Sequence, residues 1–337
     1  MPKHSIAFST LAQQDDLSLS NHLSLNLWYE IDHEALVEQS ESSQPIYVLL
    51  FGFPLGMQVA SLAQYLQNHG QIIAVNRYLG HDDLPPAFVF ELTHADESLA
   101  QSLKAYSRDN AVQCAALVNP PKLQEPGLLV MDMDSTAITI ECIDEIARLG
   151  GVYDEVASVT AQAMAGHLDF SESLRQRVAK LKGIKLDLVD ELKSQLPLMP
   201  GVEDLCATLK ANNWHLAIAS GGFVPFAAHV QKLLNLDRIH ANLLDDDGQV
   251  LVGKVSGDIV DAKEKARFLA QYRDELALPK GQTIAIGDGA NDLLMMFEAG
   301  LGVAVHGKEK VVAEAPAAIT AGSLAQLLYF VTIPKRQ

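Results

Sequence analysis

The stretch that decides the fold is LLVMDMDSTA, residues 128–137 of a chain of 337 residues. Its four apolar residues predict a short buried strand, and Asp132 and Asp134 follow that strand one residue apart. Taken alone, two acids at a strand end are more often a solvated turn than a site. Motifs elsewhere in the chain are therefore needed to distinguish a solvated turn from a functional pair of acids.

Two later apolar runs also end in residues that carry chemistry. HLAIAS ends at Ser220, which Gly221 and Gly222 follow, and TIAIGD ends at Asp288, inside GDGAND at residues 287–292. Strands and helices alternate from residue 128 onward, which predicts an α/β fold with a Rossmann-like parallel sheet and helices on both faces. Because the carboxyl ends of parallel strands share one edge, we expect these residues to meet in a crevice there.

The expected crevice gathers carboxylates. Asp132, Asp134 and Asp288 would share it, with Asp292 as a further member, and so many like charges need a cation. Mg²⁺ is the predicted cation, since it prefers carboxylates, water and substrate phosphate as ligands. Within the first pair, one carboxylate can attack phosphorus and form an aspartyl-phosphate, while the other moves protons. The set therefore predicts phosphoryl chemistry.

Phosphate oxygens need hydrogen-bond donors and a counter-charge. The Ser220 hydroxyl and the free amides of the two glycines after it are suited to hold them. The helix expected from DAKEKARFLAQYRDEL, residues 261–276, offers two lysines. Lys265 extends the apolar stripe of this helix, whereas Lys263 lies about 140° from Phe268 of that stripe at about 100° per residue. We therefore choose Lys265 and keep Lys263 as an alternative.

Four ordered motifs carry a family resemblance. With DMDST at 132–136, SGG at 220–222, the lysine helix and GDGAND, the chain resembles the haloacid dehalogenase (HAD)-like phosphohydrolases. The resemblance implies Asp132 as nucleophile, Asp134 as general acid and base, Ser220 and Lys265 as phosphate binders, Asp288 as Mg²⁺ ligand with Asp132 and the Asp134 backbone carbonyl, Asn291 as substrate ligand, and Asp292 as metal support.

A closer resemblance within that superfamily is to the phosphoserine phosphatases, through DMDSTAITIECIDEIARLGG, FSESLRQRVAKLKG and AIGDGANDLLMM. It implies a small helical cap at about residues 141–198, inserted after the first motif. It also implies Mg²⁺-dependent hydrolysis of the small molecule O-phospho-L-serine to L-serine and phosphate, a step of serine biosynthesis. Met164 and Phe170 would then be apolar lids over the substrate.

One cap helix carries an arginine on its apolar side. Phe170 begins a stripe of apolar residues at spacings of three and four, and Arg177 falls about 20° from it on the helix, whereas Arg175 does not. Such an arginine suits a bidentate bond to a substrate carboxylate, and Glu141 could bind the ammonium group. Taken alone, Arg177 would more often snorkel and Glu141 would be an ordinary first-turn acid. The family resemblance favours the binding roles.

The first third of the chain predicts a separate domain. Residues 1–44 indicate an N-terminal extension and linker, and residues 45–119 follow the order βαββαβ of an α+β ferredoxin-like domain. A Pro-rich break puts the boundary near residue 120, so the phosphatase domain would span 120–337. The βαββαβ order is similar to an ACT domain, a small-molecule-binding module that often dimerises, which leaves a homodimer through this domain open. GFPLGM, at residues 52–57, stands where such domains often carry an Asp-x-x-Gly turn.

Composition excludes several kinds of partner. The formal net charge of −17 repels nucleic acid and anionic membrane surfaces. No apolar stretch is long enough to cross a bilayer. Three widely spaced cysteines and a start without a signal pattern predict a cytoplasmic protein.

Other interpretations stay open at this point. The same chemistry could act on another small phosphomonoester or pass the phosphoryl group to an alcohol. The chain could also be an amino-acid sensor whose phosphatase half is vestigial, although an intact set of four motifs argues against that. The three acids in LLDDDGQVLVG, residues 243–253, suggest a hairpin turn rather than a Ca²⁺ loop, because the spacing and the distal glutamate of such a loop are missing.

Overall fold

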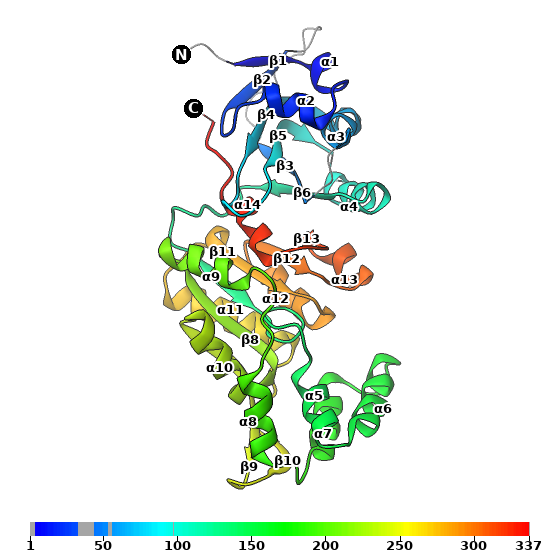
Figure 1. The fold of residues 1–337 in the computed structure, drawn as a ribbon, viewed down its shortest axis with the longest axis vertical. Helices are drawn as coiled ribbons and strands as arrows, with labels where there is room; N and C mark the ends of the chain where they lie inside the picture. Colours follow the sequence, from blue (N-terminus) through cyan, green and yellow to red (C-terminus); the bar gives the residue numbers. More distant parts are fainter. Residues whose placement is uncertain (1–3, 33–43, 53–55, 97, 337) are drawn as a thin grey trace.

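The computed structural model describes residues 4–32, 44–52, 56–96 and 98–336. These residues form an elongated molecule with an N-terminal sheet at one end, a second sheet in the middle and a group of helices at the other end (Figure 1). Within these ranges, every helix is too short or too polar to cross a bilayer.

The middle sheet has seven strands in the order β10-β9-β8-β7-β11-β12-β13, all parallel except β10. The predicted parallel sheet is thus confirmed, and the acid run at residues 243–253 forms the antiparallel hairpin of β9 and β10. The strands are β7 (Leu128–Met131), β8 (His215–Phe223), β9 (Arg238–Asp246), β10 (Leu251–Ser256), β11 (Thr283–Gly287), β12 (Leu301–Val305) and β13 (Ala317–Ile319).

Alternate residues of the central strands bury against different helices. Leu129 and Met131 of β7 share a core cluster with α9 and α10, whereas Leu128 and Val130 pack with α11 and α12. Both faces of the sheet are therefore covered, which leaves the strand ends as the accessible edge. The helices are α9 (Val202–Ala211), α10 (Val224–Leu234), α11 (Ala262–Glu275), α12 (Leu293–Glu298) and α13 (Glu309–Glu314).

A helical insertion follows the first motif, as expected. Its outgoing and returning chains pair as a short antiparallel bridge between Ile138 and Leu198, supported by the Thr139 amide donating to the Pro197 carbonyl at 3.0 Å. Asp169 caps one helix by accepting from the Glu172 amide at 2.8 Å. The insertion comprises α5 (Cys142–Leu149), α6 (Tyr153–Met164), α7 (Phe170–Lys180) and α8 (Leu186–Ser194).

The N-terminal sheet has six strands in the order β1-β2-β4-β5-β3-β6. Its antiparallel part β4-β5-β3-β6 has the strand order of a ferredoxin-like βαββαβ unit. The elements are β1 (Ser5–Ala7), α1 (Phe8–Leu11), α2 (Asp16–His22), β2 (Trp28–Asp32), β3 (Ile46–Phe51), α3 (Gln58–Leu66), β4 (Gly70–Tyr78), β5 (Ala87–Ala95), α4 (Leu99–Asn110) and β6 (Gln113–Val118).

The first 32 residues differ from the extension that the sequence suggested. β2 pairs antiparallel with β4, and β1 pairs parallel with β2, so both enlarge the same sheet. The strands were missed because they are only three and five residues long and show no clean alternation. Residues 53–55 of the GFPLGM turn lie outside the described residues, and the domain boundary near residue 120 stays a prediction.

The two sheets share a core through the end of the chain. In α14 (Leu328–Val331), Tyr329 and Phe330 are fully buried, and Phe51 of β3 packs against both rings. The Tyr78 hydroxyl donates to the Tyr329 carbonyl at 2.7 Å. Farther along, Arg336 pairs with Glu30 and Glu91 of the N-terminal sheet. The C-terminus therefore lies beside the first strands (Figure 1).

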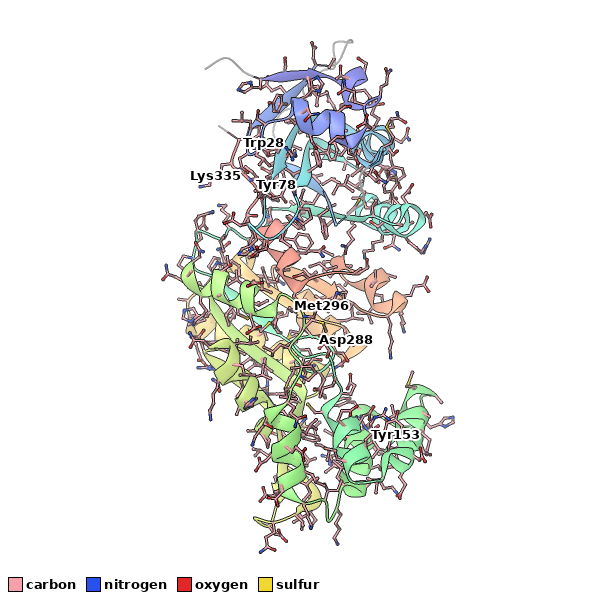
Figure 2. The ribbon with its side chains drawn as sticks, viewed as in Figure 1. Trp28, Tyr78, Tyr153, Asp288, Met296 and Lys335 are labelled. Carbon is pink, nitrogen blue, oxygen red and sulfur yellow. The ribbon has the colours of Figure 1, made fainter. Side chains whose placement is uncertain are left out.

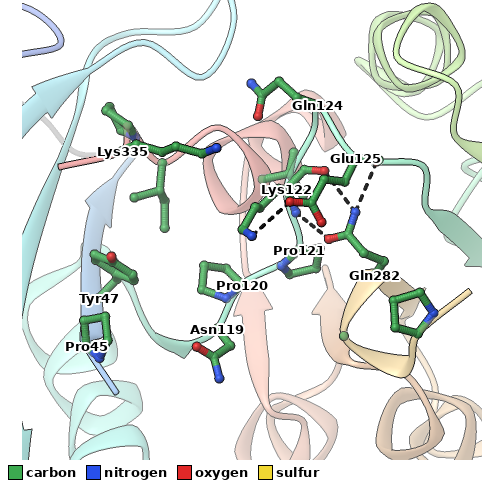
Figure 3. Close-up of a pocket in the computed structure, with 15 residues that line it drawn as sticks. Pro45, Tyr47, Asn119, Pro120, Pro121, Lys122, Gln124, Glu125, Gln282 and Lys335 are labelled. Carbon is green, nitrogen blue, oxygen red and sulfur yellow. Dashed lines mark hydrogen bonds and ion pairs between the residues drawn. The ribbon is translucent and has the colours of Figure 1, made fainter. Parts of the chain in front are cut away.

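One side chain makes several hydrogen bonds to the linker between the sheets. The Gln282 amide group donates to the carbonyls of Lys122 and Glu125, each at 3.1 Å, and its oxygen accepts from the Lys122 amide at 2.7 Å (Figure 3). These bonds satisfy backbone groups that the Pro-rich segment leaves unpaired. A pocket beside it is lined by prolines and by Tyr47 and Lys335.

Candidate active site

The three chemistry-bearing strands are direct neighbours in the sheet. β7 lies between β8 and β11, so Asp132, Ser220 and Asp288 meet at one edge, as predicted. A cavity of about 380 Å³ opens there between the sheet and the cap. Asp288 lies at the end of the sheet nearer to the cap, whose helix α6 begins at Tyr153 (Figure 2).

A buried lysine neutralises part of an acid cluster. Carboxylate oxygens of Asp132, Asp288 and Asp292 lie within 4.8 Å of one another. The Nζ of Lys265 is 2.9 Å from Asp132 Oδ2 and 2.7 Å from Asp292 Oδ1, and its side chain is fully buried. Lys263 is exposed and faces away. One ammonium group cannot balance three carboxylates, so the oxygen-rich set fits a divalent cation.

Asp134 occupies a different environment from Asp132. Burial, followed by the nearby charge of Glu141, raises the pKa of Asp134 to about 8. Its Oδ1 accepts from the Cys142 amide at 3.4 Å. A carboxyl group with this pKa carries a proton at neutral pH and can donate it to a leaving oxygen.

The phosphate cradle differs in one respect from the prediction. β8 does not end at Ser220 but continues to Phe223 with irregular pairing. The Gly222 amide is not free: it donates to the Ser220 hydroxyl oxygen at 2.9 Å. This bond leaves the Ser220 hydroxyl hydrogen available for an incoming oxygen. Both glycines are needed for close approach, because a Cβ on Gly221 would lie 2.8 Å from the Phe170 ring and one on Gly222 would lie 2.9 Å from the Asp134 carboxylate.

The cap contributes three of its four predicted residues to the cavity. Glu141, Phe170 and Arg177 line it, and Glu141 Oε1 accepts from the Ser135 hydroxyl at 2.8 Å. Arg177 Nε is buried and has no hydrogen-bond partner among the described residues. Met164 differs from the expectation, since it is 74% exposed at the end of α6 and does not line the cavity.

Some lining residues were not predicted. Lys308 and Lys310 border the cavity from the segment after β12. A strand next to β11 must end at the same edge, so strand order would have pointed to them. Asn242 fixes the cradle by donating to the Gly221 carbonyl at 2.8 Å and accepting from the Val260 amide at 2.9 Å. A lone asparagine inside a strand gives no such signal in the sequence.

The acid cluster predicts that stabilisation by a divalent cation depends on pH. Burial and the charge of Asp132 raise the pKa of Asp288 to about 6 and that of Asp292 to about 7. Because folding raises both pKa values, the metal-free protein loses stability as the pH rises through about 6 and about 7. Below these pH values, protons compete with a cation for the same carboxylates. We expect the gain in Tm on adding MgCl₂ to be larger at about pH 8 than at about pH 5.

Thermal unfolding in MgCl₂ and in NaCl of equal ionic strength would measure this gain. Asp288→Asn should lose most of the gain at the higher pH. A gain in Tm that is the same at both pH values, or that survives in Asp288→Asn, would contradict a cation site at this cluster.

The fold and the site together define a hydrolase of the haloacid dehalogenase-like class. The model of the haloacid dehalogenase-like hydrolase family matches residues 127–300, which contain the acid pair, the cradle, the buried lysine and the second acid motif.

Individual relatives narrow the class. The phosphoserine phosphatase of Vibrio cholerae serotype O1 is 46% identical over 229 residues, covering 68% of this chain and 68% of that protein. That of Haemophilus influenzae is 48% identical over 223 residues, covering 66% and 71%. The crystal structure of a probable phosphoserine phosphatase from Vibrio cholerae has a TM-score of 0.69 at 37% identity, covering 85% of this chain and 86% of that one. The chain belongs to the phosphoserine phosphatase family of these hydrolases.

Proposed function

We propose that the protein is a Mg²⁺-dependent phosphatase that hydrolyses O-phospho-L-serine to L-serine and phosphate. The choice of substrate rests on Arg177 and Glu141, which line the same cavity. The buried Nε of Arg177 lacks a hydrogen-bond partner among the described residues. A guanidinium group with a buried, unpaired Nε favours a carboxylate, and Glu141 favours an ammonium group. Phosphoserine carries both groups beside its phosphate.

The reaction divides between the two acids of the first motif. Asp132 attacks phosphorus, the bond from phosphorus to the serine oxygen breaks, and Asp134 protonates that oxygen as it leaves. Asp134, now a carboxylate, takes a proton from water, which attacks the aspartyl-phosphate and returns Asp132. The proton that serine receives is thereby replaced, and each cycle consumes one water molecule.

The remaining residues hold charge and position. Lys265 lies 2.9 Å from Asp132 and would stabilise the attacking carboxylate and the phosphate oxygens. Ser220 and the two glycines after it would bind a phosphate oxygen, and Asn291, which lines the same cavity, would contact the substrate. Asp132, Asp288 and Asp292 would hold Mg²⁺, which supplies charge neutralisation at the phosphate when bound.

Phosphate release is the direct test. Purified protein is incubated with O-phospho-L-serine, with and without MgCl₂, alongside phosphorylated sugars, phosphoglycolate and phosphothreonine. We expect strong Mg²⁺-dependent preference for phosphoserine. Faster turnover of another ester would support the roles of the two acids and contradict phosphoserine as the substrate. No turnover of any ester would favour the interpretation of the protein as an amino-acid sensor. Adding alternative alcohols distinguishes transfer from hydrolysis, because transfer yields a new phosphate ester.

Arg177 provides a specific test of carboxylate recognition. Arg177→Met is expected to raise the KM for phosphoserine about 100-fold, since a buried ionic hydrogen bond to the substrate is lost. O-phosphoethanolamine lacks the carboxylate, so its kcat/KM should be nearly the same in the variant and the parent protein. Arg175→Met is the matched control, because Arg175 is exposed on the same helix. Equal losses for both substrates would contradict the assignment.

Two broader expectations accompany this function. Serine biosynthesis would place the enzyme in the cytoplasm. A homodimer through the N-terminal sheet stays a prediction, which sedimentation of the full chain would test.

A further inference from the structure

A second cavity lies between the two halves of the molecule. It has a volume of about 630 Å³ and separates α4 and β6 of the N-terminal sheet from α13 and β13. Its walls are mostly small apolar side chains, and alanine is the commonest residue among them. The charged groups around it are Lys104 and Arg108 of α4 and Glu309 of α13. The cavity thus combines an apolar lining with a few polar groups, which is typical of small-molecule sites.

Lys104 gives this cavity an unbalanced positive charge. Its Nζ is half-buried and donates to the carbonyls of Ala313 and Ala315, at 2.7 and 2.6 Å. Desolvation by burial lowers the pKa of the ammonium group. Among the described residues, no carboxylate lies close enough to raise that pKa again. The acid on the cavity wall, Glu309, lies instead 3.9 Å from Arg108. Two of the three donors of Lys104 are used, so one remains for a further acceptor.

We propose that this cavity is a binding site for a small aliphatic carboxylate, with the carboxylate on Lys104 and the carbon chain against the alanine walls. An anion would neutralise the half-buried ammonium group and use its third donor. The lining favours a carboxylate with a short carbon chain over a bare inorganic anion, because the apolar walls would otherwise stay in contact with water.

Helix α13 connects this cavity with the active site. Lys310 and Val311 line the active-site cavity, whereas Glu309 and Val312 line the second one. α4 contacts this short helix at both ends, through two hydrogen bonds at one end and an exposed ion pair at the other. Lys104 binds carbonyls at its C-terminal end, and Arg108 Nη1 lies 3.9 Å from Glu309 Oε1 at its first residue. A carboxylate on the third donor would draw the ammonium group toward itself and weaken its bonds to those carbonyls. α13 would then shift, so the site would regulate substrate binding.

Binding is tested on the full chain with sodium butyrate as the probe and butyramide as its uncharged counterpart. Ligand-observed NMR titration should give butyrate binding that weakens about tenfold or more in Lys104→Met. Ala105→Phe, which fills the cavity and keeps the ammonium group, should weaken it similarly, and this variant decides the matter if Lys104→Met does not fold. Lys232→Met, at an exposed lysine of α10, should bind like the parent protein. Equal binding of butyramide, or unchanged butyrate binding in Ala105→Phe, would overturn the proposal.

Regulation is tested by kinetics and rests on the proposed function. Saturating butyrate should change the KM for phosphoserine about fivefold or more in the parent protein and leave it unchanged in Ala105→Phe. The same KM with and without butyrate, in a protein that binds butyrate, would overturn the link through α13. The NMR titration needs no turnover, so failure of the phosphatase proposal and failure of this site remain distinguishable.

Discussion

Asp132→Asn is expected to lower the turnover of phosphoserine by at least about 10⁴-fold, because an amide oxygen cannot form the aspartyl-phosphate. The side chain keeps its size, and its oxygen can still accept from the Met133 amide, which lies 2.7 Å from Asp132 Oδ1. Lys265 keeps its contact with Asp292. We therefore expect a folded protein that binds substrate and does not turn it over.

Phosphate release measures the loss, and circular dichroism with thermal unfolding checks the fold. Asp204→Asn is the control, since Asp204 is an exposed aspartate on α9 and should change neither property. Covalent labelling by ³²P-phosphoserine should be seen in the parent protein after acid quench and be absent from Asp132→Asn. Turnover within tenfold of the parent would exclude Asp132 as the nucleophile.

The acid site was accessible from the sequence because strand order and motif order coincide. Asp132, Ser220 and Asp288 each follow or end an apolar run, and parallel strands bring such ends to one edge. The choice of Lys265 over Lys263 needed only helical periodicity, since one position of α11 faces the sheet and the other faces solvent.

Other features depend on contacts that no local pattern encodes. The bond from the Gly222 amide to Ser220 arises from the irregular end of β8, and the sequence gives only SGG. Met164 follows the family pattern in sequence, yet it lies exposed at the end of α6. β1 and β2 are stabilised by pairing with a sheet whose other strands begin after residue 45, so short-range patterning could not reveal them.

The N-terminal sheet and the catalytic half form one packed unit. Phe51 and Tyr78 of the first sheet share a core cluster with Tyr329 and with β7 of the second. α13 lines both the active-site cavity and the second cavity, which lies between the two halves. The proposed coupling between the carboxylate site and substrate binding would pass through this one short helix.

Asp134→Asn is expected to lower kcat for phosphoserine by about 10²–10⁴-fold, the range that a lost general acid and base accounts for. The asparagine can neither protonate the serine oxygen nor take a proton from water. The raised pKa of Asp134, about 8, matters for the first of these roles, because the group holds the proton before the bond breaks. The variant should keep Asp132, and with it the ability to form the aspartyl-phosphate.

An ester with a better leaving group separates the two roles. p-Nitrophenolate leaves without a proton, so Asp134→Asn should form the aspartyl-phosphate from p-nitrophenyl phosphate and then hydrolyse it slowly. Stopped-flow absorbance should show a burst close to one p-nitrophenol per active site, followed by slow turnover. Asp132→Asn should give no burst with the same ester. A slow Asp134→Asn reaction without a burst would mean that Asp134 acts before or during attack by Asp132, and the assignment of the water-activating role to it would be wrong.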